Sequence, residues 1–169
     1  PETPEDEALA GPYAQRAIRR ITGADESTTY PLVHQSIYSV HQRVAVRFRQ
    51  GRVLLAGDAA HVNNPLGGFG LNSGIHDAIS LGQALSRVVK GEEGDEALER
   101  YNRQRQQANV AYVQELSVRN KKNLEEKDPA LRAQRMQELR AVCADPVKAR
   151  EYLLNSSMIN SIHRAQSVA

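Results

Sequence analysis

Residues 51–78, "GRVLLAGDAAHVNNPLGGFGLNSGIHDA", constrain the fold more than any other part of the sequence. A short apolar run ends at Gly57-Asp58, and a loop rich in glycine and proline then leads to a helix expected from about Ser73. In open α/β sheets, ligands bind beyond the carboxyl ends of strands and close to helix N-termini. The segment therefore predicts a ligand site at the end of a strand.

Each part of this segment suits one kind of contact with a ligand. A carboxylate at Asp58 can accept hydrogen bonds from sugar-like hydroxyls, and Gly67, Gly68 and Gly70 let the backbone approach a flat ligand closely. Asn72-Ser73 would add free backbone N–H groups and the positive end of a helix dipole. For any single glycine, a tight loop before a capped helix is the better explanation. The combination over residues 58–72 favours a site for a ligand with hydroxyls and developing negative charge.

The composition excludes several other classes of protein. The chain has 169 residues, is 40% hydrophobic and carries a formal net charge of only +2, which gives no support for nucleic-acid binding. No apolar run approaches the length of a membrane helix. The single cysteine, Cys143, excludes an internal disulfide framework and favours a cytoplasmic location. We expect this side chain to be buried.

The pattern around the segment predicts an α/β fold. Short helices are expected before Gly23, and Val44, Val46 and Phe48 alternate with polar residues as in a half-buried strand. Residues 52–56 read as a strand buried on both faces. The helix at 73–89 is expected to turn its apolar stripe inward. That stripe consists of Ile75, Ala78, Ile79, Gly82, Leu85 and Val89.

Almost everything beyond Gly94 is expected to be helical. A long helix would run from Asp95 to about Lys122. The pairs Asp128-Pro129 and Asp145-Pro146 each resemble an N-cap followed by proline in the first turn, so they predict two further helices.

The segment resembles the second FAD-binding motif of the aromatic-ring flavoprotein monooxygenases, the p-hydroxybenzoate hydroxylase family. That pattern consists of an apolar strand, Gly-Asp-Ala-Ala-His, a proline, a Gly-Gly-x-Gly-x-Asn loop and Asp-Ala on the next helix, and all of it is present here. The resemblance is dense over residues 51–85 and weaker over 30–50. It implies three parts: the end of a substrate domain (1–50), a flavin-ring-binding strand, loop and helix (51–91), and a C-terminal helical region (92–169).

The resemblance also implies a role for individual residues. Asp58, which follows Gly57, would bind the ribitol hydroxyls of FAD. The loop at Gly68 and the backbone at 70–72 would hold the flavin ring, and Pro65 would turn its carbonyl toward the substrate pocket. The residues implied for that backbone contact are Gly70, Leu71 and Asn72.

The implied reaction is hydroxylation of a phenolic compound or an aromatic acid. NAD(P)H would reduce FAD, and O2 would form a flavin C4a-hydroperoxide that hydroxylates the ring. The family's Gly-x-Gly-x-x-Gly turn for the FAD pyrophosphate is missing from this chain. We therefore expect the C-terminal portion of a monooxygenase, which needs its N-terminal part to bind FAD well.

Several side chains and two other functions remain open. His34, Tyr38, His41 and Arg43 would border the substrate pocket by resemblance, although an ordinary exposed sheet face explains them equally well. His61 is expected to support the loop rather than to bind a metal, and Asp77 to bond the backbone of the glycine loop. The alternatives to a hydroxylase are another FAD-dependent enzyme of this fold (epoxidase, halogenase or dehydrogenase) and a non-enzymatic helical interaction module.

Overall fold

The computed structural model describes residues 3–168, which form two compact units that divide between Ser39 and Val40. In the first unit, α1 (Glu5–Ala8) and α2 (Gly11–Thr22) are followed by an irregular segment. Gly23 ends α2 with φ +70°, which confirms the predicted stop. The first helix begins at Glu5, with Pro4 as its N-cap.

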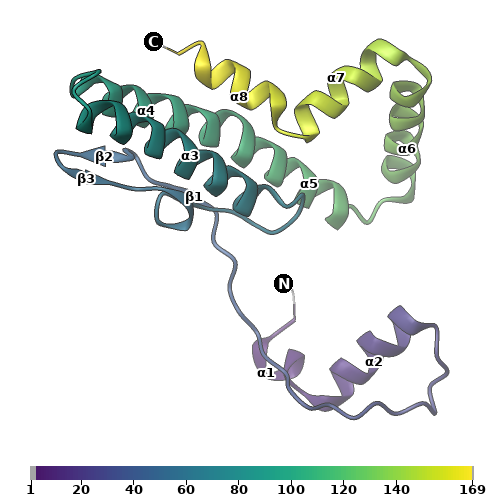
Figure 1. The fold of residues 1–169 in the computed structure, drawn as a ribbon. Coiled ribbons are helices and arrows are strands. Elements are labelled where there is room, and N and C mark those ends of the chain that lie inside the picture. Colours follow the sequence, from purple (N-terminus) through teal and green to yellow (C-terminus); the bar gives the residue numbers. More distant parts are fainter. Residues whose placement is uncertain (1–2, 169) are drawn as a thin grey trace. The chain divides into compact units, whose positions relative to one another are not determined.

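The second unit combines two short hairpin-like sheets with a set of helices (Figure 1). Two antiparallel strand pairs precede the helices: β1 (Arg43–Val44) with β4 (His61–Val62), and β2 (Arg49–Gln50) with β3 (Val53–Leu54). A short 3-10 turn, η1 (Gly57–Ala59), lies between β3 and β4. The helical part consists of α3 (Phe69–Val89), α4 (Glu96–Ala108), the π-helix η2 (Asn109–Gln114), α5 (Glu115–Glu125), α6 (Pro129–Ala144), α7 (Pro146–Ser156) and α8 (Ile159–Gln166).

The helices after residue 94 follow the sequence closely. Asp128 accepts a hydrogen bond from the backbone N–H of Ala130 (2.8 Å), and Asp145 accepts one from that of Val147 (2.9 Å). Both predicted N-caps are therefore confirmed. The last helix, α8, was not predicted, and Cys143 is exposed, contrary to the expectation of burial.

The strand predictions need two corrections. Phe48 is buried, but Val46 is 87% exposed, because the chain bends between β1 and β2 and breaks the alternation. The segment at 52–56 is not a doubly buried strand: β3 pairs only with β2, and Val53 is 64% exposed. Nothing within the described residues covers that face.

The apolar stripe of α3 also lies on the opposite side from the one predicted. The buried residues of α3 are Phe69, Ser73, Asp77 and Ala84. Within the predicted stripe, Ile79 is 54% exposed and the other residues are exposed as well. Leu71, which precedes the stripe, is 77% exposed. Helix α3 therefore packs on α4 through a face that includes polar residues, and its most apolar face has no cover within residues 40–168.

A small apolar core lies beneath α3 and α4. Its buried members are Phe48, Ala60, Ala84, Ala97, Leu98 and Tyr101. A second cluster joins the start of α3 to η2, α5 and the residue before α8. Its members are Phe69, Val113, Leu116 and Met158. These two clusters hold the first turn of α3 and the loop before it against the helical part.

The exposed stripe predicts opposite effects for two polar substitutions on α3. Ile75→Gln should change the free energy of unfolding of this chain by no more than about 0.5 kcal/mol, because Ile75 is already 47% exposed. Ala84→Gln should destabilise it by roughly 1–3 kcal/mol, because Ala84 is 2% exposed and belongs to the apolar core, where a polar amide loses its hydrogen bonds to water. Urea unfolding measures both values. An equally large loss for Ile75→Gln would show that the stripe is covered.

Candidate functional site

The carboxylate of Asp77 holds the Gly57-Asp58 turn against α3. Asp77 is fully buried, and its Oδ2 accepts hydrogen bonds from the backbone N–H of Gly57 (3.1 Å) and from His61 Nε2 (2.7 Å). Its Oδ1 accepts one from Arg105 Nε on α4 (2.7 Å). We call Asp77, His61, Arg105 and the two residues described next, Ser73 and Asn109, the Asp77 network.

Ser73 and Asn109 complete this network. The Ser73 hydroxyl donates to Asn109 Oδ1 (2.7 Å) and accepts from Arg105 Nη2 (3.2 Å). Asn109 Nδ2 donates to the carbonyl of Arg105 (3.0 Å). Because all five side chains are buried, each hydrogen bond that is lost leaves a desolvated polar group behind. The network therefore ties the Gly57-Asp58 turn to two helices at once.

The charges in the network balance. Burial acts to raise the pKa of Asp77, but the hydrogen bond from His61 and the charge and hydrogen bond of Arg105 outweigh it, so this pKa lies below its usual value. Asp77 is therefore ionised and forms a buried ion pair with Arg105, whose side chain is 5% exposed. An ionised carboxylate only accepts hydrogen bonds, so His61 Nε2 carries the proton that it donates.

Close glycine contacts put Asp58 beside α3. A Cβ atom built on Gly74 would lie 3.2 Å from the Cα of Gly57, so a side chain at position 74 would push the turn away from the helix. Gly57 also has φ +61°, which favours glycine. Asp58 itself is exposed. Gly74 follows Gly70 by four residues, which is about 6 Å along a helix, so Gly57 meets α3 about one turn beyond the first turn of that helix.

The first turn of α3 is open and begins earlier than predicted. Gly68 is the N-cap, with φ +66°, so the helix starts at Phe69 and not near Ser73. The backbone N–H groups without an intrahelical acceptor are therefore those of the first residues, including Gly70 and Leu71. The N–H of Asn72 lies four residues after Gly68, so the Gly68 carbonyl is its intrahelical acceptor. The side chain of Asn72 donates to the Gly68 carbonyl (2.8 Å) and thereby stabilises the turn.

A second set of hydrogen bonds fixes the loop just before Pro65. Asn64 Nδ2 donates to Gln42 Oε1 (2.8 Å) and to the carbonyl of Ser117 (3.2 Å), and its Oδ1 accepts from the N–H of Leu66 (3.1 Å). Gln42 Nε2 in turn donates to Ser117 Oγ (2.8 Å). We call Asn64, Gln42 and Ser117 the Asn64 network. It holds both sides of Pro65, whose carbonyl accepts from the N–H of Gly68 (3.1 Å).

The π-helix η2 allows the continuous rod formed by α4, η2 and α5 to contribute side chains to both networks. In an uninterrupted α-helix, Ser117 would lie about 120° around the axis from Arg105. One extra residue in a turn rotates the following residues by about 100°. The π segment at 109–114 therefore brings Ser117 back to nearly the same side as Arg105 and Asn109. The segment from Gly57 to Leu66 is therefore held at both ends from this side of the helix.

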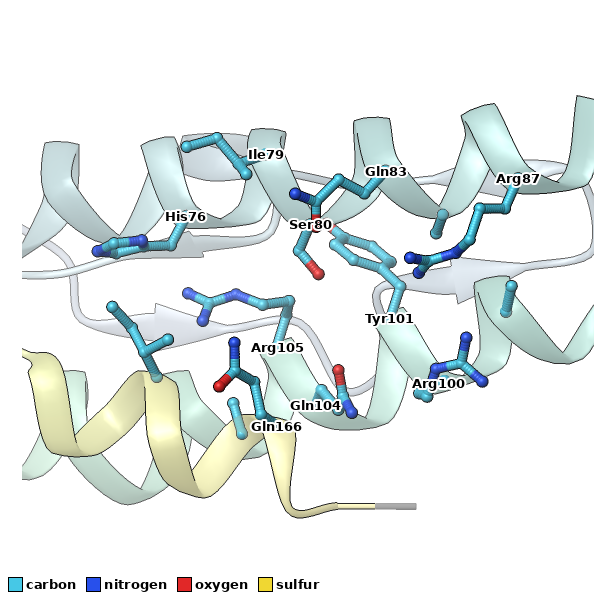
Figure 2. Close-up of a pocket in the computed structure, with 14 residues that line it drawn as sticks. His76, Ile79, Ser80, Gln83, Arg87, Arg100, Tyr101, Gln104, Arg105 and Gln166 are labelled. Atoms are coloured by element: carbon cyan, nitrogen blue, oxygen red, sulfur yellow. The ribbon is translucent and has the colours of Figure 1, made fainter. Parts of the chain in front are cut away.

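A polar groove of about 300 Å³ lies elsewhere in this unit, between α3, α4 and α8 (Figure 2). Arg87 and Arg100 line it and share one partner, Glu93. His76 and Arg105 also line it, and burial together with the charge of Arg105 lowers the pKa of His76. None of the residues predicted to bind the flavin ring or ribitol lines this groove. The candidate site is therefore the open surface formed by Asp58, the loop and the first turn of α3.

The structure brings together only part of the predicted site. Gly57 lies against Gly74 of α3, and the Asn64 network holds the loop before that helix. Asp77 bonds the backbone of Gly57 and not that of the glycine loop, which corrects the expected partner. The proposed substrate residues are divided between the two units: His34 and Tyr38 lie in an irregular segment of the first, and His41 and Arg43 are exposed in the second.

Sequence reasoning missed the residues that support this surface. Arg105 and Asn109 lie about 30 residues after Asp77 in the chain, and no local pattern relates them to it. The pair Asn63-Asn64 before Pro65 carried a turn signal, which could have indicated a structural role for these side chains. Among the described residues, no group of three or more His, Cys, Asp or Glu side chains is placed to hold a metal ion. No helix in the same residues is long and apolar enough to cross a membrane.

Comparison with known proteins decides the family. A family model described as "FAD binding domain" matches residues 2–116, which is more than half of the chain. The chain belongs to this FAD-binding family. The predicted FAD-binding fold is therefore confirmed, in a form that is mostly helical with few strands.

The relatives of this FAD-binding chain are aromatic monooxygenases. It is 34% identical over 161 residues to para-nitrophenol 4-monooxygenase of Pseudomonas sp. (strain WBC-3), which covers 92% of this chain and 40% of that protein. It is 47% identical over 74 residues to 3-(3-hydroxy-phenyl)propionate/3-hydroxycinnamic acid hydroxylase of Mycolicibacterium smegmatis, covering 44% of this chain and 13% of that protein. The chain thus spans less than half the length of these relatives.

Solved structures give the same result. The crystal structure of p-nitrophenol 4-monooxygenase PnpA from Pseudomonas putida DLL-E4 matches with a TM-score of 0.78 and 32% identity, over 96% of this chain and 40% of that one. The flavin-dependent monooxygenase PieE, solved with FAD and substrate, matches with a TM-score of 0.62 at 24% identity, over 99% of this chain and 29% of that one, which supports the fold alone.

The residues at the candidate site fit a flavin. Asp58 and the loop residues Pro65, Gly67 and Gly68 are exposed, so a flat ligand has access to them. Gly67 has φ +108°, and a Cβ atom there would overlap the Phe69 ring and lie 2.7 Å from Asn120 Nδ2. The loop therefore keeps its path only with glycine at this position.

The Asp77 network predicts a specific loss of stability in acid. A carboxylate whose pKa is lowered by folding stabilises the fold above its usual pKa, and this contribution is lost as pH falls through the lowered value. For Asp77 that loss occurs below about pH 4. Asp77→Asn should abolish this loss of stability in acid. At neutral pH the same substitution should destabilise the chain by roughly 3–5 kcal/mol, because Arg105 stays buried without its counter-ion.

Urea unfolding at several pH values measures both effects of Asp77→Asn. The matched control is Asp95→Asn, since Asp95 also pairs with an arginine, Arg49, but its side chain is 76% exposed. That control should cost no more than about 1 kcal/mol. Equal losses for the two variants would contradict the central role of Asp77.

Proposed function

We propose that this chain supplies the flavin-ring and ribitol half of the FAD site in an aromatic hydroxylase. The observation that carries the proposal is the exposed Asp58 in a turn that Asp77 holds, through the Gly57 N–H, about one helical turn beyond the first turn of α3. FAD reduced by NAD(P)H would supply the activation of O2 needed to hydroxylate an aromatic ring. The protein's part is to bind and orient FAD and the substrate.

Each residue of the surface has a separate task in this proposal. Asp58 accepts hydrogen bonds from ribitol hydroxyls, and its exposed carboxylate needs no rearrangement to do so. The backbone of Gly70, Leu71 and Asn72 lies along the pyrimidine edge of the ring. The positive end of α3 then stabilises negative charge that develops on that edge when the flavin is reduced. This contribution is largest where water is excluded from the ring.

Pro65 is the residue we assign to the substrate side. Its ring restricts φ, the Asn64 network holds the residues on both sides of it, and the hydrogen bond from the N–H of Gly68 leaves one lone pair of its carbonyl free. A phenolic hydroxyl can donate to that lone pair. Gly57 and Gly68 contribute positive φ angles that give the two turns their direction.

The substrate and the rest of the enzyme are inferred from the relatives. Para-nitrophenol and hydroxyphenyl-propionate in their names indicate a phenol or an aromatic acid. His41 and Arg43, both in the second unit, are the side chains we propose for its polar groups. Because the chain spans less than half of its relatives, we propose that an N-terminal part supplies the pyrophosphate-binding turn. A cytoplasmic location remains a prediction.

Titration of FAD, followed by quenching of flavin fluorescence, tests the proposal. The chain alone should bind FAD weakly or not at all, and addition of the N-terminal half should give saturable binding. The assembled protein should then oxidise NAD(P)H in the presence of a phenol and release a ring-hydroxylated product. An assembly that binds no FAD would support a non-enzymatic interaction module, and FAD binding without a hydroxylated product would support another flavin reaction.

Asp58→Ala should weaken FAD binding by the assembled protein about 10- to 100-fold. The ribitol hydroxyls would lose a charged acceptor worth roughly 1.5–3 kcal/mol. The control is Asp6→Ala, which removes the same charge from an exposed position on α1. A dissociation constant for Asp58→Ala within twofold of the unsubstituted protein would exclude Asp58 from the site.

A further inference from the structure

Two neighbouring asparagines before Pro65 are in opposite situations. Asn64 makes three hydrogen bonds within the protein. Asn63 makes none: both its Nδ2 and its Oδ1 are shielded from solvent and have no hydrogen-bond partner within the described residues. A buried amide without partners destabilises a fold, and few such groups exist in native proteins. The position of Asn63 therefore needs an explanation other than stability.

Asn63 lies at the surface that we assign to the flavin. A Cβ atom on Gly70 would lie 3.5 Å from Asn63 Nδ2, so the amide touches the first turn of α3, where the pyrimidine edge of the ring is proposed to lie. The residue is only half-buried overall, and its neighbour Pro65 and the loop residues Gly67 and Gly68 are exposed. To meet a ligand at this surface, the amide has to rotate about the side-chain bonds of Asn63.

The chemistry of a carboxamide matches that edge of the ring. The pyrimidine edge of a flavin presents the N3–H donor between two carbonyl acceptors. An asparagine side chain offers one acceptor and one donor side by side, so it can pair with N3–H and with one neighbouring carbonyl at the same time. Leucine has a similar shape but offers neither group.

We propose that Asn63 is a flavin-binding residue whose amide pairs with the N3–H and an adjacent carbonyl of the bound isoalloxazine ring. This inference rests on the proposed FAD site and adds a side-chain contact to its backbone contacts. The Asn63 amide is then unpaired in the chain without FAD and gains its hydrogen bonds when the cofactor binds.

Asn63→Leu tests the inference through two measurements with opposite expected signs. In urea unfolding of the chain without FAD, Asn63→Leu should raise the midpoint, because two unpaired polar atoms are removed. In the FAD titration of the assembled protein, the same variant should bind about tenfold more weakly. Asn64→Leu should lower the urea midpoint, since it leaves Gln42 Oε1 and the Leu66 N–H unpaired. Asn123→Leu, at an exposed position on α5, should change neither value.

FAD methylated at N3 identifies the atoms involved. The unsubstituted protein should prefer FAD over the N3-methyl analogue, and Asn63→Leu should lose most of that preference, since the two changes remove the same hydrogen bond. Unchanged FAD affinity in Asn63→Leu, or a urea midpoint that falls as in Asn64→Leu, would overturn the inference. An unsubstituted assembly that binds no FAD would overturn the proposed function and this inference with it.

Discussion

The rest of the site depends on the buried ion pair between Asp77 and Arg105. Through it, one carboxylate on α3 joins the backbone of Gly57, the imidazole of His61 and the guanidinium of α4. Besides the hydrogen bond from Gly57, the turn that exposes Asp58 is supported by the contact of Gly57 with Gly74 and by the buried Ala60 at its end. An ion pair at this depth contributes little net stability, but it is costly to break. It therefore selects one position for Asp58 rather than simply strengthening the fold.

The helical part supports the surface that we propose for the flavin. The rod formed by α4, η2 and α5 carries both networks on one side. Helix α3 packs on this rod and itself carries the exposed stripe around Ile75 and Ile79. This chain spans 40% of para-nitrophenol 4-monooxygenase. We propose that the N-terminal part of the enzyme covers this exposed apolar stripe.

The sequence was most informative where local chemistry decides the structure. The caps at Asp128 and Asp145 and the stop at Gly23 follow from side-chain and backbone preferences of a few residues, and all three are confirmed. The motif at 51–78 led correctly to the family. The face of α3 was predicted wrongly, because periodicity identifies the most apolar face but not whether a partner is present to cover it. The Asp77 network could not be predicted, since Arg105 meets Asp77 only through the packing of α4 on α3.

The central claim is that Asp77 holds the Gly57-Asp58 turn in place before any cofactor binds. The most direct measurement is hydrogen exchange of the Gly57 amide in the chain without FAD. The account predicts that this amide is among the slowest to exchange in residues 40–168, and that Asp77→Asn brings its rate close to that of exposed loop amides. Fast exchange of the Gly57 amide in the unsubstituted chain would contradict the account, because the turn would then be ordered only by its ligand.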